Sequence, residues 1–240
     1  MRIKMKRLQG KVDKLAKTNS KDEQVKILQE INDSLLSEYE LKIEDKKGCF
    51  YIEPLRVEAY YYHPEKFEDS NAHTDDKQKN NFGKLYIHRK GRGGVDICLS
   101  NSEEYYLSFL IKNSQIRTDN NDGEPFLRQR ALKEMLKDIE GIDDQNVLAE
   151  KVQKSEEIVY RTVRKGLISK CYKNEYLASL IKIDNLYDFE PGYGKGKIVV
   201  DYVRQNESIK DIAKFSAKCR ELLGYNMSES DIIKLNNEGK

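Results

Sequence analysis

The sequence predicts an α+β fold, a single mixed domain in which helices flank a curved, mostly antiparallel sheet and a helical extension follows. Three observations lead to this prediction. Residues 56–112 contain three stretches whose side chains alternate as in strands, so that one face of a sheet is apolar. Apolar residues recur at helical spacing before and after these stretches. With 38% apolar residues, the 240-residue chain is long enough to bury a core.

The changes of pattern divide the chain into three parts. Residues 1–40 are predicted to form a basic arm and a helix, residues 41–190 the α+β domain, and residues 191–240 the helical extension. We find no internal repeat and no low-complexity segment that would indicate a repeat architecture or a disordered linker.

The N-terminal part begins with a short basic stretch. Residues 1–19 hold seven Lys or Arg against one acidic residue, Asp13, with apolar residues at helical spacing. Such a stretch either contacts nucleic-acid phosphates or forms a solvated, partly frayed terminus. Ser20 and Glu23 have the spacing of a capping box, which predicts a second helix that runs to about Tyr39.

The central strands place a set of polar side chains on one face of the sheet. Residues 41–56 predict a hairpin that leads into the next alternating strand. In the three alternating stretches, one face carries the apolar core and the other is polar. The long loop 63–81 adds a histidine between two of these strands. The polar face is expected to gather Glu58, Tyr60, Tyr86, His88, Asp96 and Lys112, with His73 arriving on the loop.

These residue types point to the recognition of a nucleobase. A carboxylate held by a nearby cation and by hydrogen bonds can orient and activate a water molecule. Tyr and His rings can stack on a planar heterocycle. Each of these residue types also has a structural alternative, because a strand carboxylate, a strand-end lysine or a loop histidine is often only a solvated side chain.

The order of the short motifs VEAY, AHT, LYIH, a following Asp and LIK resembles the methylpurine (alkyladenine, 3-methyladenine) DNA glycosylase family. The resemblance covers roughly residues 50–130. The segment GEPFL at 123–127 is similar to a Gly-Pro turn that opens a helix in the family, and RKGL at 164–167 is similar to a later segment. What the resemblance implies is a sheet that binds a flipped purine and hydrolyses its N-glycosidic bond.

The resemblance also implies a role for each matched residue. Its catalytic residues are Glu58, Lys112 and His73. Glu58 is the base that activates water, Lys112 replaces an Arg that supports the glutamate, and His73 stacks on the flipped base. The residues that bind the base are Tyr60, Tyr86, His88 and Asp96.

Two of the base-binding positions differ from the family, and so does the turn between two strands. His88 stands where the family has a tyrosine, and Asp96 replaces the Asn that tests the purine edge. The turn reads KGRGG, and its Lys90 and Arg92 can contact phosphate, although a tight hairpin alone also requires glycine. It lacks the bulky residue that fills the space left by a flipped nucleotide. These differences favour an alternative, a non-catalytic module that binds a nucleobase or nucleic acid.

The C-terminal half is predicted to be mostly helical. One helix is expected from Pro125 to near Gly141, and another from about Asp143 towards Ile158. The segment Ser208–Leu223 either forms a helix-turn-helix, which would make DNA binding through these helices a third function, or contributes ordinary packing helices.

Composition narrows the class of protein. The net charge of +2 gives no global attraction to nucleic acid, so any footprint must be a local patch. The four cysteines are scattered without a CxxC motif, which indicates neither a zinc site nor a disulfide framework. No apolar run is long enough for a membrane span and no signal peptide is evident, so we expect a cytoplasmic protein without a membrane partner. We expect a monomer that acts on DNA or a modified nucleobase without a metal or cofactor.

Overall fold

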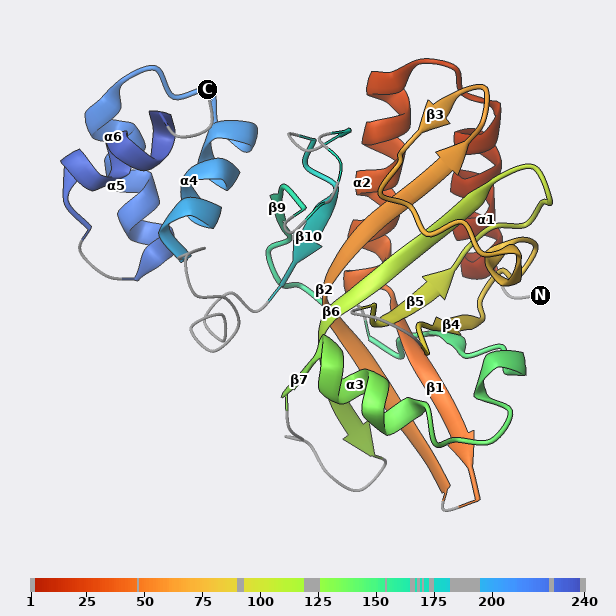
Figure 1. Ribbon diagram of the computed structural model, residues 1–240. Coiled ribbons are helices and arrows are strands. Elements are labelled where there is room, and N and C mark those ends of the chain that lie inside the picture. The colour runs from red at the N-terminus through yellow and green to blue at the C-terminus, as the bar shows by residue number, and fades with distance from the viewer. Residues whose placement is uncertain are drawn as a thin grey trace. The chain divides into compact units, whose positions relative to one another are not determined.

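The computed structural model confirms the α+β fold class, with a curled antiparallel sheet and helices (Figure 1). The chain divides into two compact units, one of Met1–Val159 with Val163–Ile181 and one of Tyr160–Thr162 with Lys182–Lys240. The structure describes residues 3–46, 48–89, 93–118, 126–153, 155–164, 167, 169, 171–172, 175–181, 195–224 and 227–237.

The first unit is built on the antiparallel sheet. Six hydrogen-bonded strands of this sheet lie in the order β4-β5-β6-β2-β1-β8. Strands β3 and β10 also pair with β2, and β7 pairs with β6. The strands are β1 (Tyr39–Asp45), β2 (Gly48–His63), β3 (Phe67–Glu68), β4 (Leu85–Ile87), β5 (Val95–Cys98), β6 (Tyr106–Thr118), β7 (Phe126–Arg128), β8 (Leu148–Glu150) and β10 (Ala178–Leu180).

Strands β2 and β6 form the spine of this sheet, and their pairing runs from Phe50 opposite Thr118 to Tyr62 opposite Tyr106 (Figure 1). The predicted alternation is confirmed along β2, because Val57, Ala59 and Tyr61 are all buried on the apolar face. The register shifts between Pro54 and Val57, where the two strands are irregular. A proline cannot donate to the ladder, and such irregularities re-aim the side chains beside them.

Helices α1 (Ile3–Lys17) and α2 (Lys21–Ser37) pack against each other and belong to the same unit as the sheet. Leu8, Val12 and Leu15 of α1 are fully buried. Lys11 Nζ donates to the Glu30 carbonyl at 3.0 Å. From Ile3 to Lys17 the basic stretch is therefore a packed amphipathic helix, as the helical spacing of its apolar residues predicts.

Two predictions after β6 need correction, the first in the extent of a helix and the second in the kind of element. The helix expected from Pro125 begins only at Gln129, as α3 (Gln129–Leu136), because residues 126–128 form β7 against β6. The helix expected from Asp143 is instead the 3₁₀ turn η2 (Ile142–Asp144) followed by β8. Pairing of β8 with the edge strand β1 satisfies its backbone groups and overrides the local helical spacing. A second 3₁₀ turn, η1 (Asp76–Gln78), lies in the loop before β4.

The second unit contains β9 (Tyr160–Thr162), α4 (Lys195–Asn206), α5 (Ile212–Leu223) and α6 (Glu229–Asn237). Its helices pack through buried Val199, Val203, Cys219 and Ile232. The segment Ser208–Leu223 contains one continuous helix capped by Asp211. The helix-turn-helix considered there is therefore wrong, and the alternative of an ordinary packing helix is confirmed. No helix in the described part of the chain has the length and apolarity that a bilayer span requires.

Candidate functional site

Four of the residues predicted to form a site line one cavity of about 380 Å³ in the first unit. Tyr60 comes from β2, Asp96 from β5, His88 from the end of β4, and His73 from the loop before it. Leu110 of β6 closes one side. Strand pairing explains this meeting, since β5 and β2 flank β6 and alternation turns their polar side chains to one face.

Glu58 is fully buried and lies next to this cavity rather than in its lining. Its Oε2 accepts a hydrogen bond from the Tyr60 hydroxyl at 3.0 Å, and its Oε1 accepts one from Arg56 Nη2 at 3.2 Å. Burial, and then the negative charge of Glu58, raise the pKa of Tyr60 far above its ordinary value. The hydroxyl therefore stays protonated and acts as a donor towards Glu58.

The cation beside Glu58 is Arg56 and not the predicted Lys112. Among the described residues, no ion pair or hydrogen bond joins Lys112 to Glu58. The irregular register supplies the reason: Arg56 pairs with Asn113 and Val57 with Ile111, which leaves Lys112 as an extra residue in β6. The sequence offered a signal for Arg56, because it lies two residues before the glutamate on the same strand.

Asp96 is a second buried carboxylate, 3% exposed, and it lines the cavity. Its Oδ2 accepts hydrogen bonds from Gln78 Nε2 at 2.8 Å, Ser108 Oγ at 3.1 Å and His88 Nε2 at 3.1 Å. Its Oδ1 is buried and has no hydrogen-bond partner among the described residues. One oxygen of this carboxylate is thus fully occupied while the other is still an open acceptor.

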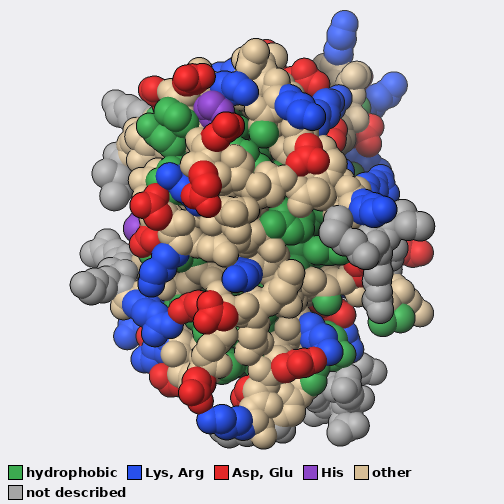
Figure 2. Space-filling model, turned by 90° about the vertical axis from the view of Figure 1, so that its right-hand side faces the viewer, with side chains coloured by type: hydrophobic (Ala, Val, Ile, Leu, Met, Phe, Trp, Pro, Cys, Tyr) green, Lys and Arg blue, Asp and Glu red, His purple; other side chains and the backbone are tan. Residues whose placement is uncertain are grey.

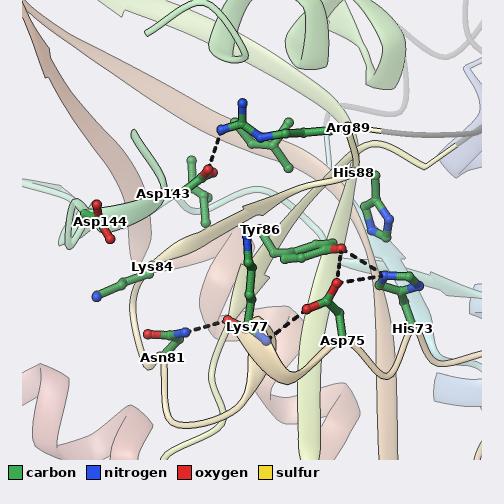
Figure 3. A pocket seen from close by; sticks show the side chains of 12 residues that line it. His73, Asp75, Lys77, Asn81, Lys84, Tyr86, His88, Arg89, Asp143 and Asp144 are labelled. Carbon is green, nitrogen blue, oxygen red and sulfur yellow. Dashed lines mark hydrogen bonds and ion pairs between the residues drawn. The ribbon is translucent and has the colours of Figure 1, made fainter. Parts of the chain in front are cut away.

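The rings of His73, Tyr86 and His88 form a cluster with centroids 4.8 to 5.3 Å apart. The Tyr86 hydroxyl donates to Asp75 Oδ2 at 2.9 Å, and it lies 3.0 Å from His73 Nε2 (Figure 3). Because Tyr86 has one proton to donate, its oxygen accepts from His73, which places a proton on Nε2. The backbone N–H of Lys77 and the Tyr86 hydroxyl lower the pKa of Asp75, so it is an anion that anchors this cluster.

A larger cavity of about 770 Å³ shares His73 and His88 with the smaller one (Figure 3). Its lining adds the cations Lys77, Lys84 and Arg89 together with three acidic side chains. Arg89 is paired with Asp143 at 2.5 Å. No ion pair joins Lys77 or Lys84 to another described residue, so these two cations remain available to an anionic ligand.

The glycine-rich turn is described only in part. The predicted phosphate contacts Lys90 and Arg92 lie outside the described residues. A side chain added at Gly93 would overlap the ring of His88. Glycine is therefore needed here so that the backbone can approach a ring of the cavity wall, and not only to complete a turn.

Arg164 is a further part of the site that alternation along the strands did not reveal. Its Cζ lies 4.6 Å from the centroid of the Tyr60 ring, and its Nη1 donates to Asp69 Oδ2 at 2.5 Å and to the Ala59 carbonyl at 3.0 Å. The side chains of Arg164 and Asp69 are both 0% exposed. This ion pair ties the loop that leads to His73 to the back of Tyr60.

The surface gives no broad electrostatic footprint on the face that Figure 2 shows. Lys and Arg side chains alternate there with Asp and Glu, and apolar side chains occur in small separate areas. Among the described residues, no group of three or more His, Cys, Asp and Glu is arranged to hold a metal ion. The small cavity brings together carboxylates, aromatic and imidazole rings, and the guanidinium group of Arg164.

Comparison with protein-family models gives no match, and comparison with curated protein sequences gives none either. The resemblance to methylpurine glycosylases remains a prediction carried by the matched motifs alone.

Proposed function

We propose that the small cavity binds a purine base and that the protein is a DNA glycosylase-like hydrolase acting on a damaged or modified purine. The observation that carries the proposal is the convergence of Tyr60, His73, His88 and Asp96 on one cavity of about 380 Å³. Cavities of a few hundred Å³ with aromatic walls and a few fixed polar groups are typical of small-ligand sites. A purine supplies both a face for the rings and an edge for the carboxylate.

Glu58 and Tyr60 support a way to activate water. Tyr60 lines the cavity and donates its proton to the buried Glu58 at 3.0 Å. A water held at the Tyr60 oxygen can attack the sugar carbon while its proton passes to that oxygen and the phenolic proton passes to Glu58. The carbon–nitrogen bond breaks and its electron pair leaves with the base. Arg56, at 3.2 Å, balances the charge of Glu58 before the proton arrives.

The larger cavity supports nucleic acid as the source of the base. It shares His73 and His88 with the smaller cavity, and its lining contains Lys77 and Lys84. Lysines next to a base site are suited to the phosphates that flank a flipped nucleotide. In this arrangement the base enters the smaller cavity and the backbone lies along the larger one.

A second function, a non-catalytic module that binds a nucleobase, is favoured by the state of Glu58. The carboxylate is 0% exposed, and each of its oxygens already accepts a hydrogen bond from a protein group. A base that touches water directly would need an open oxygen. In this alternative Glu58 is a structural acceptor, and the cavity binds without hydrolysis.

Base release separates the two functions. Oligonucleotides that carry alkylated or deaminated purines, in duplex and single-stranded form, are incubated with wild type, Glu58→Gln and Tyr60→Phe. We expect release by wild type and a loss of at least about a hundredfold in both variants, in the range of general-base catalysis. Lys112→Gln is the matched control and should keep wild-type activity. Binding of modified purines without release by wild type would establish the non-catalytic module.

A further inference from the structure

The first unit contains a third cavity, a groove of about 900 Å³ that shares no lining residue with the two already described. Its described lining comes from the hairpin of β1 and β2, from β6, and from α3 with the residues that follow that helix. The groove is therefore a separate surface, whose role does not depend on the proposed base site.

The sheet contributes apolar side chains to the floor of this groove. Phe50 of β2 pairs with Ile43 of β1, and Ile116 of β6 pairs with Ile52 of β2. Directly paired residues share a face of the sheet, and Ile43 and Ile52 are fully buried in the core. Phe50 and Ile116 are only half-buried, so the apolar face of the sheet continues from the core into the groove.

Helix α3 and the residues after it add further apolar side chains to the groove. Leu132 and Leu136 are buried in the core, whereas Met135 and Ile139 are half-buried and line the groove. Half-buried apolar side chains that come together in a hollow of the surface mark a place from which another molecule can exclude water.

The charged part of the described lining is mostly acidic. Lys46 is its one cation, and its Nζ lies 2.8 Å from Glu140 Oε2. These two side chains are 89% and 84% exposed, so their ion pair is weak and the cation of a partner can replace Lys46. Glu44 is likewise paired with exposed Lys42, whereas Asp138 is exposed and forms no ion pair with another described residue. The carboxylates of the lining are those of Glu44, Asp45, Asp138 and Glu140.

We infer that this groove binds a basic amphipathic helix of a partner protein, with the apolar side chains of the helix on the floor and its Lys or Arg side chains at the rim. Helices bind such grooves through apolar residues three and four positions apart, which form a stripe along one side of the helix. The carboxylates favour basic flanks, because complementary charges steer the partner and exclude acidic competitors. The same carboxylates repel the phosphates of nucleic acid, so this surface suits a protein and not DNA.

The test selects peptides that bind the full chain from a random phage-displayed library of about 16 residues, the length of four helical turns. We expect the enriched sequences to carry apolar residues at helical spacing, flanked by Lys or Arg. The affinity of an enriched peptide is then measured by fluorescence anisotropy. Asp138→Lys with Glu140→Lys should weaken it at least about tenfold, because attractive charges become repulsive. Glu103→Lys with Glu104→Lys makes the same charge change on exposed side chains outside the groove and should keep the affinity within about twofold of wild type.

An NMR spectrum of the protein with ¹³C-methyl-labelled methionine locates the bound peptide. The methyl resonance of Met135 should shift on binding, while that of Met5 on α1, outside the groove, should stay in place. A library without enriched peptides, or enriched peptides without both basic and apolar residues, would overturn the inference. So would an equal loss of affinity in both double variants, or binding that leaves Met135 unchanged. If Asp138→Lys with Glu140→Lys does not fold, as judged by thermal unfolding, the Met135 resonance of wild type still decides the matter.

Discussion

The surroundings of Glu58 and of Asp96 differ, although both carboxylates are buried in the same sheet. Glu58 has a cation, Arg56, and a hydroxyl, Tyr60, one on each oxygen. Asp96 has three donors on one oxygen and none on the other among the described residues. Both oxygens of Glu58 therefore accept hydrogen bonds within the protein, whereas one oxygen of Asp96 lacks a donor among the described residues.

This difference predicts that the fold depends on the partners of Glu58 more than on the open oxygen of Asp96. Removing a partner of Glu58 leaves a buried charge without compensation, so the fold should suffer. Changing Asp96 to Asn keeps the three donors on one oxygen and alters only the oxygen that has no partner among the described residues, so the fold should suffer little. The following variants test this contrast, from the largest expected effect on stability to the smallest.

Arg56→Ala should be the most damaging. It leaves the carboxylate of Glu58 buried without its cation, and we expect a loss of about 3–5 kcal/mol in the free energy of unfolding. Chemical denaturation measures this loss. The double variant Arg56→Met with Glu58→Gln removes both charges and should recover most of it. A double variant as unstable as the single one would show that the guanidinium acts through packing and not through Glu58.

Tyr60→Phe should change the response to alkaline pH. Burial and Glu58 raise the pKa of Tyr60, whereas a tyrosine in the unfolded chain ionises near pH 10. The folded state therefore keeps a proton that the unfolded state loses, so this contribution to stability is fully present below about pH 10 and is lost as the pH rises further. Unfolding followed across this range should show a shallower decline for Tyr60→Phe. An unchanged slope would mean that the hydroxyl already reaches water.

Asp96→Asn should leave the free energy of unfolding within about 1 kcal/mol of wild type, because the amide oxygen keeps the three donors and no unpaired charge is created. Denaturation curves of the two proteins give this difference. A loss as large as that of Arg56→Ala would place Asp96 among the structural residues and end the contrast with Glu58.

Lys112→Ala should have the smallest effect. Lys112 is half-buried and forms no ion pair with Glu58 in the described structure, so its truncation should change the free energy of unfolding by less than about 1 kcal/mol. Measured beside Arg56→Ala, it shows which of the two cations supports the glutamate. A large loss of base release in Lys112→Ala, with stability kept, would restore the role that the family resemblance implied.

Much of the sheet and part of the site follow from side-chain alternation. The period of two predicts that Tyr60, His88 and Asp96 share a face, and they line one cavity. The position of His73 between two strands is enough to bring it near them. These predictions depend only on local geometry and strand order, which the sequence carries directly.

Two kinds of feature could not be predicted from the sequence. One depends on an irregular strand register, and the other on contacts between residues that are far apart in the sequence. The shifted register near Pro54 gives Glu58 its cation from Arg56, and alternation alone assumes a regular ladder. Asp69 and Arg164 are 95 residues apart, so no local pattern connects them. Apolar residues around 148–150 recur at helical spacing, but these three residues form a strand because they pair with the edge of β1.

The two histidines that border both cavities give the cavities a shared wall. A ligand that turns the ring of His73 or His88 in one cavity alters the wall of the other. By linkage, an anion in the larger cavity that strengthens base binding is itself bound more tightly when a base is present, by the same factor. Gly93 lies against His88, so a movement of this ring would change the contact between them.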